Sequence, residues 1–361
     1  MNYLLVFILL FIYANQQIPK DKKYNINHKR RRTTSFLECV NEAYDDTGSV
    51  TFVDLKIYLD TEYLLDQLSS HINYKEPLLK AMKKAAEILE SFLKIYKGLN
   101  PKVKEDEEIS KYVGKWNKTL VSKEVQDDYT MFDKGYSFVI LFRLQEDMEE
   151  TKIATSKILY LDECKNPLVG LISINPNKNY NAMPQEYLDT IMLHQFSHLL
   201  AFNYAVFTPI FEDNGCLERN IDDPLLLYLS SDKVVEYAKK YFGCDSLTRV
   251  EMVLDKEGIN FHWSSRYLLG EYMADLSNIE EQVISGFTLA LFEDLGYLQI
   301  KSSFTGGLMK FGKNQGCNFL DKKCLGDTES GNEIKFRNDF YSPKMNKLIV
   351  ILKSQVVQVE D

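Results

Sequence analysis

The sequence has few histidines and no excess of basic residues. Five histidines occur among 361 residues, and the formal net charge is −9. A protein that binds nucleic acid is usually basic, so this charge argues against nucleic acid as a partner. Any metal site built on imidazole groups must draw on a short set of residues: His28, His71, His194, His198 and His262.

Long apolar runs are also scarce. Residues 1–14 contain one run, which is too short to span a bilayer. We interpret it as a secretory signal peptide cleaved near Ala14, with an uncleaved hydrophobic N-terminus as the alternative. The end of the sequence, from Gln358 to Asp361, is polar, so we expect no lipid-anchor signal with a hydrophobic tail. We therefore expect a secreted or cell-surface protein with no transmembrane helix beyond the signal peptide.

Several signals in the chain depend on secretion. Residues 15–45 are polar and basic, which is typical of a solvated leader and also permits a pro-like segment. Asn117 begins the sequon Asn117-Lys118-Thr119, a glycosylation acceptor in a secreted protein. An even number of cysteines permits disulfides, although the sequence does not give their pairing. The cysteines are Cys39, Cys164, Cys216, Cys244, Cys317 and Cys324.

The apolar patterns predict an α+β fold. In the first half they predict a strand, a helix, three strands and a helix, at residues 50–59, 75–98, 136–144, 157–161, 169–174 and 188–202. We expect the region from about 203 to 320 to be mainly helical, with its clearest helices at 232–241 and 280–294. This organisation places an N-terminal α/β subdomain at 46–205, a C-terminal subdomain at 206–330 and a tail at 331–361.

The segment His194-Gln195-Phe196-Ser197-His198 lies in the last helix of the first half. Residues four apart share a helix face, so both imidazoles can reach one metal ion. Two histidines at this spacing are by themselves more often surface or core residues than ligands. The same spacing occurs in zinc peptidases, where a glutamate after the first histidine is the general base. Gln195 can hydrogen-bond a water but cannot take its proton.

A catalytic zinc site needs a third protein ligand. His262 opens the segment His262-Trp263-Ser264-Ser265-Arg266, and Glu271-Tyr272-Met273 follows it. With these motifs the chain resembles the leishmanolysin-like zinc endopeptidases, a family of metzincins, over residues 50 to 324. The gap of 64 residues between His198 and His262 is similar to the long insertion of that family. Further similar stretches lie at residues 159–175, 234–244, 290–296 and 316–324.

The resemblance implies a metzincin-type fold, with a twisted mixed sheet and an active-site helix in the N-terminal subdomain. It implies peptide or protein substrates and hydrolysis by a water activated on one Zn²⁺ ion. Met273 would form the hydrophobic floor beneath the metal. The pairing Cys164–Cys216 is only a guess, and Cys324 matches a cysteine whose partner lies in a C-terminal domain that we expect this chain to lack. The resemblance implies that His194, His198 and His262 bind the zinc ion. It also implies a disulfide between Cys244 and Cys317.

The chain departs from the family pattern at several positions. Gln195 replaces the glutamate, and Ser264 replaces the glutamate that usually follows His-Trp. Ala201 replaces a glycine, which would cost about 1–2 kcal/mol if the backbone there were left-handed. A helix that continues to Phe202 is the alternative. The cysteine-containing pro-segment motif of the family is also missing, because residues 37–40 match it poorly.

These departures leave several functional hypotheses. General-base catalysis contributes about 10²- to 10⁴-fold to the rate, or roughly 3–5 kcal/mol of barrier, so Gln195 predicts an impaired zinc endopeptidase. The alternative is an inactive zinc-binding pseudopeptidase that holds extended peptides along an edge strand. A third hypothesis is that the protein has lost zinc binding as well and keeps only the scaffold. It is disfavoured, because the three histidines are retained. The sequence predicts neither substrate preference nor oligomeric state.

Overall fold

The computed structural model describes residues 51–68, 75–96, 107–112, 132, 135–162, 164–275 and 282–321. The chain divides into two compact units, Met1–Arg32 and Thr33–Asp361, and every described residue belongs to the second. The predicted signal peptide, the leader, the sequon at Asn117 and the tail at 331–361 lie outside the described residues, as do Cys39 and Cys324.

The main sheet has four strands in the order β2-β4-β6-β5. β2 (Ile57–Asp60), β4 (Phe138–Leu144) and β6 (Pro167–Ile174) are parallel, and β5 (Ala154–Leu161) pairs antiparallel with β6 at the edge. All eight residues of β6 are buried, as expected for a parallel strand that is covered on both faces. The three strands predicted between residues 136 and 174 are therefore confirmed, and the sheet is mixed.

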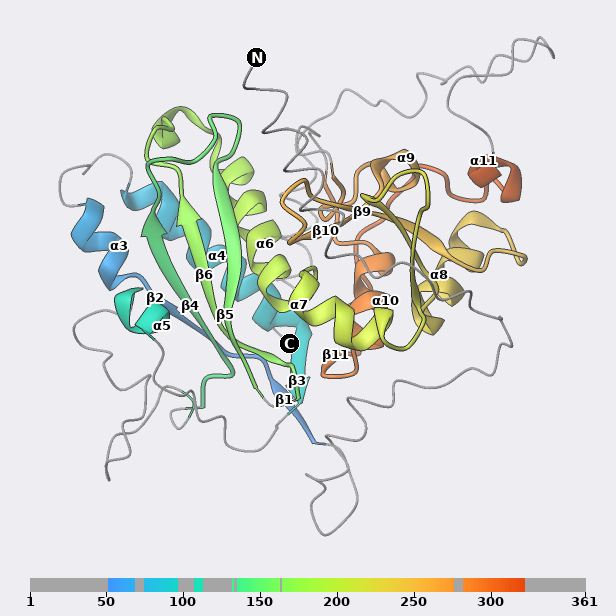
Figure 1. The fold of residues 1–361 in the computed structure, drawn as a ribbon, viewed down its shortest axis with the longest axis horizontal. Coiled ribbons are helices and arrows are strands. Elements are labelled where there is room, and N and C mark those ends of the chain that lie inside the picture. Colours follow the sequence, from blue (N-terminus) through green and yellow to red (C-terminus); the bar gives the residue numbers. More distant parts are fainter. Residues whose placement is uncertain are drawn as a thin grey trace, which may run out of the picture. The chain divides into compact units, whose positions relative to one another are not determined.

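Helices cover both faces of this sheet (Figure 1). α4 (Lys75–Phe92) and α6 (Gln185–Leu200) pack against each other on one face, where they share a core with Phe138, Ile140 and Phe142. Val139 and Leu141 point to the opposite face and pack with Ile109 of α5 (Glu107–Tyr112). This alternation along β4 follows from the two-residue period of a strand. A short helix, α3 (Glu62–Gln67), precedes α4.

A second sheet of three strands corrects two predictions. β3 (Leu93–Tyr96) lies between β1 (Phe52–Asp54) and β11 (Leu298–Ile300), and both pairings are antiparallel. The helix predicted to reach residue 98 therefore ends at Phe92, because pairing with β1 and β11 overrides the helical periodicity. The strand predicted at 50–59 is in fact two strands, β1 and β2, which belong to different sheets.

The C-terminal part contains a four-stranded antiparallel sheet, so the expectation of a mainly helical region was incomplete. The sheet order is β10-β9-β8-β7, formed by Phe261–Trp263, Val250–Leu254, Leu226–Leu229 and Leu217–Arg219. Strands of three to five residues are too short to give a clear alternating pattern. The helical elements here are α7 (Tyr204–Phe207), a π-helix (Thr208–Glu212), α8 (Asp232–Phe242), α9 (Ser265–Leu268), α10 (Gly286–Asp294) and α11 (Cys317–Asp321).

The two long helices of this part were predicted with different success. α8 ends at Phe242, one residue beyond the predicted end, and Gly243 follows it with a φ of 69°, a left-handed conformation suited to glycine. α10 begins at Gly286, six residues later than predicted. The Ser285 hydroxyl accepts a hydrogen bond from the Phe287 amide at 3.2 Å and so caps the helix at this point.

The described cysteines show one complete disulfide and one free thiol. Cys244 and Cys317 are joined, with 4.9 Å between their Cα atoms, which is the pair implied by the family resemblance. Cys216 is free, whereas Cys164 is disulfide-bonded. The guessed pairing Cys164–Cys216 is therefore wrong.

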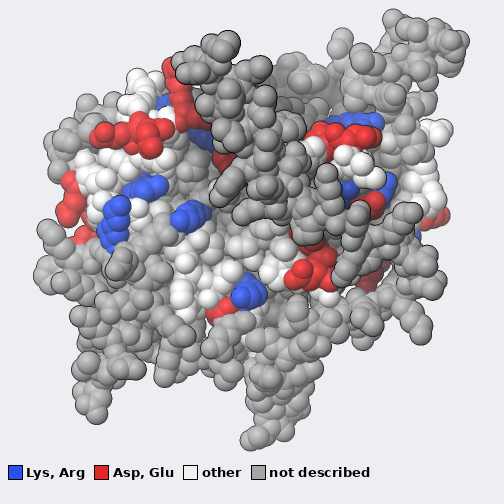
Figure 2. Space-filling model, viewed as in Figure 1, with Lys and Arg blue, Asp and Glu red and all other residues white. Residues whose placement is uncertain are grey.

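Surface charge is mixed on the face in view. Acidic and basic side chains of the described residues are interspersed there (Figure 2), so neither sign dominates this part of the surface. Among the described residues, no helix has both the length and the apolar composition needed to cross a bilayer.

Candidate metal centre

Helix α6 lies unusually close to the main sheet. It begins at Gln185, three residues before the predicted start, and ends at Leu200, two residues before the predicted end. A Cβ atom added to Gly170 of β6 would lie 2.6 Å from Leu199 Cδ1, so this approach requires glycine in the strand. The close contact fixes the C-terminal half of α6, which carries two of the histidines.

The end of α6 does not use a left-handed backbone at Ala201. This residue has φ −147° and ψ −54°, which is not left-handed. The Phe202 amide donates to the Ser197 carbonyl oxygen at 3.1 Å, and the chain then leaves the helix. The left-handed backbone that would have made alanine costly at this position is therefore not adopted, and the helix does not continue to Phe202. The turn also brings the Phe202 carbonyl within 2.9 Å of His198 Nδ1.

His262 reaches the same place from the C-terminal sheet. It lies in the middle of β10, opposite Val253 of β9. On the other side of β10, the Trp263 amide donates to the Met273 carbonyl at 2.8 Å, and the Asp275 amide donates to the Trp263 carbonyl at 3.1 Å. Met273 is fully buried next to this strand. His262 is thus held between β9 and residues 273–275.

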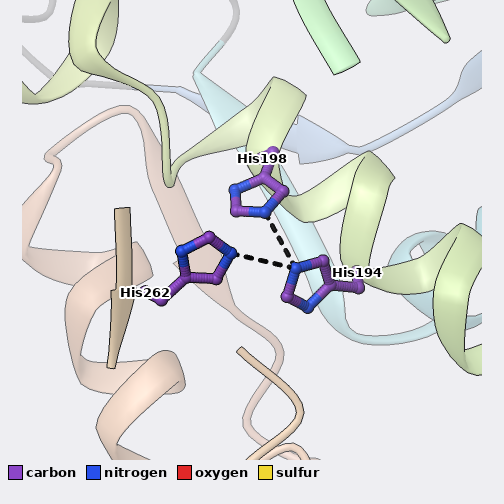
Figure 3. Close-up of side chains that lie close together, drawn as sticks. All are labelled: His194, His198 and His262. Atoms are coloured by element: carbon purple, nitrogen blue, oxygen red, sulfur yellow. Dashed lines mark hydrogen bonds between the residues drawn. The ribbon is translucent and has the colours of Figure 1, made fainter. Parts of the chain in front are cut away.

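The three imidazole rings converge through their Nε2 atoms (Figure 3). His194 Nε2 lies 2.9 Å from His198 Nε2 and 3.3 Å from His262 Nε2. The three possible ligand nitrogens lie within 4.8 Å of one another, and no other group of this kind occurs among the described residues. His198 is buried, and the other two histidines are half-buried. Residues far apart in sequence therefore present three nitrogen donors to one point.

The hydrogen bonds determine which ring nitrogens carry protons. His194 Nδ1 lies 2.7 Å from the Tyr272 carbonyl oxygen, and His198 Nδ1 lies 2.9 Å from the Phe202 carbonyl oxygen. A carbonyl oxygen can only accept, so both Nδ1 atoms carry a hydrogen. Burial lowers the pKa of His194 and, to a greater degree, the pKa values of His198 and His262, which favours neutral rings.

This protonation pattern fits a metal ion. In neutral His194 and His198 the Nε2 atoms bear lone pairs, which face each other at 2.9 Å. Two facing lone pairs repel, whereas a cation between them would be attracted to both. Tetrahedral Zn²⁺ with Zn–N bonds of about 2.0–2.1 Å places its ligand nitrogens roughly 3.3–3.4 Å apart. The observed spacings of 2.9 and 3.3 Å are close to this value.

Gln195 lies beside the first histidine and has an unusual environment. Its side chain is half-buried, and its Oε1 atom is inaccessible to solvent and has no hydrogen-bond partner among the described residues. An unpaired buried polar atom costs about 1–3 kcal/mol. The fold therefore gains no internal hydrogen bond from the amide oxygen at the position where zinc peptidases carry the general base.

A buried network behind the site was not found by sequence reasoning. The Glu271 carboxylate accepts hydrogen bonds from the Thr288 hydroxyl at 2.5 Å, the Met273 amide at 2.5 Å, and both the amide and the hydroxyl of Ser285. The Trp263 indole donates to Thr288 at 2.9 Å. Burial raises the pKa of Glu271 to about 7 against the effect of these donors. The sequence indicated Glu271 only as the first residue of the Glu271-Tyr272-Met273 motif, because its hydrogen-bond partners Ser285 and Thr288 lie at the start of α10.

The fold and the site define the class of protein first: a mixed α/β chain with a three-histidine centre of the kind that metallopeptidases use. The family follows from comparison with known proteins. The leishmanolysin family model matches residues 119–336, which is more than half of the chain. The chain therefore belongs to the leishmanolysin family, whose members are zinc metallopeptidases.

Curated relatives support the same assignment over part of their length. The chain is 32% identical over 169 residues to a leishmanolysin homolog of Crithidia fasciculata, covering 45% of this chain and 24% of that protein. It is 27% identical over 228 residues to a leishmanolysin of Leishmania major, covering 59% and 36%. A leishmanolysin-like peptidase of Caenorhabditis elegans is 35% identical over 96 residues, covering 26% and 14%. The matched region thus spans about a third or less of these relatives.

Proposed function

We propose that this chain is a zinc-binding metzincin-type member of the leishmanolysin family whose peptide-bond hydrolysis is impaired at Gln195. The observation that carries the proposal is the convergence of three Nε2 atoms, with two Nδ1 atoms held as donors by carbonyl oxygens. His194, His198 and His262 would hold the ion, and Met273 would pack beneath it. Bound zinc would act as a Lewis acid toward water and the peptide carbonyl.

The impairment follows from the chemistry of the residue beside the first ligand. A carboxylate at position 195 could accept a proton and return it to the leaving amine, as general acid–base catalysis requires. The amide of Gln195 can hydrogen-bond a water but has no basic site at neutral pH. We therefore expect slow hydrolysis, with the histidines still able to bind metal and to contact a ligand.

The second candidate is an inactive protein that binds extended peptides. It is supported by the position of β5, which pairs with β6 and comes last in the strand order of the main sheet among the described residues. Adding a further strand to the edge of a sheet is a common way to hold an extended peptide. Gln195 separates this candidate from the first, because binding does not need a base. For both candidates we also propose that the protein is secreted or exposed at the cell surface and that its ligands or substrates are peptides or proteins.

The test compares native protein with the Gln195→Glu variant, both loaded with zinc. We expect about one zinc per chain in each, and hydrolysis of a peptide library about 10²- to 10⁴-fold faster in the variant. Gln299→Glu makes the same chemical change at an exposed position of β11 and should alter neither property. A Gln195→Glu/His262→Ala double variant should lose both zinc and turnover.

Each outcome decides between the readings. Peptide binding without turnover in native protein, with turnover in Gln195→Glu, supports the binding function. Chelator-sensitive turnover in native protein at the rate of the variant would refute the impairment. Absence of zinc from both proteins would refute the metal centre.

A further inference from the structure

The residue that precedes the methionine of the Glu271-Tyr272-Met273 motif makes two contacts with α6. The Tyr272 carbonyl oxygen accepts from His194 Nδ1 at 2.7 Å, and the Tyr272 hydroxyl lies 3.0 Å from the Ser197 hydroxyl. Both side chains are buried, with 2% of Tyr272 and none of Ser197 exposed. The main chain and the side chain of Tyr272 thus contact helix α6 at two points.

The direction of the hydroxyl bond can be assigned from its neighbours. Ser197 Oγ donates to the Leu193 carbonyl oxygen at 2.8 Å, so its single proton is already used. The Tyr272 hydroxyl must therefore donate to Ser197 Oγ. The phenol supplies the proton that this bond requires, and a lone pair of Ser197 Oγ accepts it.

The same segment also holds the third histidine in place. The Met273 carbonyl accepts from the Trp263 amide, which follows His262 directly. Glu271 accepts from the Met273 amide and, through Thr288, is linked to the Trp263 indole. Residues 271–273 are therefore bonded to the helix that carries His194 and His198 and to the strand that carries His262.

We propose that Tyr272 and Ser197 form a positioning pair that sets helix α6 against the His262 strand and keeps His194 in the tautomer with a free Nε2 lone pair. The inference rests on the proposed zinc-binding function. Neither residue touches the reacting atoms. Their effect is indirect, because a shift of the Tyr272 carbonyl would release Nδ1 of His194 and allow the proton to move to Nε2, where it blocks metal binding.

The test uses the full chain and the variants Tyr272→Phe, Ser197→Ala and the double variant. Zinc affinity is measured by competition with a chromophoric chelator, and the tautomers of His194 and His198 by ¹⁵N NMR without metal. We expect each single variant to bind zinc about tenfold more weakly. The double variant should be weakened no further than a single one, because the two residues act through one bond. His194 should become a mixture of tautomers, while His198, bonded to Phe202, stays unchanged.

The matched control is Tyr180→Phe. Tyr180 is as buried as Tyr272, and its hydroxyl donates to the Asn175 carbonyl at 2.6 Å, away from the histidines. Loss of this hydroxyl should lower thermal stability without changing zinc affinity or either tautomer. Equal zinc affinity in native protein and Tyr272→Phe, or equal weakening in Tyr180→Phe, would overturn the pair. If native protein binds no zinc, the proposed function fails, and an unchanged His194 tautomer in Tyr272→Phe would then overturn the pair as well.

Discussion

Helix α6 and residues 261–275 supply ligands to one centre but are held by different forces. The packing of α6 on the main sheet is apolar: Phe196, Leu199 and Leu200 are fully buried, and Leu199 contacts the sheet where Gly170 leaves room. Residues 261–275 are fixed by hydrogen bonds that converge on the buried carboxyl group of Glu271. Apolar packing does not depend on pH, whereas a buried acid does. The two halves of the centre should therefore respond differently to mutation and to pH.

The largest effect should come from removing the carboxyl group. Glu271→Ala leaves the Met273 amide, the Ser285 groups and the Thr288 hydroxyl without their acceptor. Each unpaired buried donor costs about 1–3 kcal/mol, so we expect the free energy of unfolding to fall by roughly 4 kcal/mol. Urea unfolding monitored by circular dichroism, with a chelator present, measures this change.

Glu271→Gln is the matched control for this loss. Glutamine keeps an acceptor for Ser285 and Thr288 but turns its amino group toward the Met273 amide. We expect a loss of about 1–2 kcal/mol, at most half that of the alanine variant. Equal losses in the two variants would mean that the network contributes little and that packing also holds the second half of the centre.

The pH dependence should be the next largest effect. The pKa of Glu271 is raised from 4.5 to about 7, so the folded protein binds this proton more tightly than the unfolded chain does. A raised pKa contributes stability that is complete below the unfolded value and disappears as the pH rises through the folded value. At 1.36 kcal/mol per pH unit, the contribution should fall by about 2–3 kcal/mol between pH 5 and pH 8.

The measurement is the difference in unfolding free energy between native protein and Glu271→Gln across this range, without metal. Subtraction removes the groups that both proteins share. The difference should decrease steadily with pH. A flat difference would show that Glu271 is ionised throughout, as its four donors alone would favour.

The smallest effect concerns the apolar half. Gly170→Ala adds a Cβ atom 2.6 Å from Leu199 Cδ1, and overpacking of this kind costs about 1–3 kcal/mol. The loss should be the same at pH 5 and pH 8, in contrast to the Glu271 effect. Adding Leu199→Ala to the Gly170→Ala variant should recover part of the lost unfolding free energy, because the smaller side chain makes room. A further decrease in unfolding free energy beyond the sum of the two single losses would argue against the contact.

The elements of the first half could be predicted because their patterns are long and local. Strands β4, β5 and β6 and helix α6 follow from the apolar patterns within their own segments, and each of these elements is seven or more residues long. The end of α4 and the C-terminal sheet could not be predicted, because β3 and β7–β10 are short and their stability comes from partners distant in sequence. Helical periodicity continued through β3, and only pairing with β1 and β11 excludes a helix there.

At the metal centre the division is the same. The sequence by itself determined the donor types, the spacing of His194 and His198 on one helix face, and the absence of a base at Gln195, since these are matters of residue identity and helical geometry. The family resemblance had implied His262 as the third ligand, but only the tertiary structure shows its ring beside the other two. Only the tertiary structure shows that carbonyl oxygens of Tyr272 and Phe202 set two tautomers. It also decided that Ala201 needs no left-handed backbone. These features depend on contacts across 64 residues or more, or on the path of the chain after the helix, which no local pattern encodes.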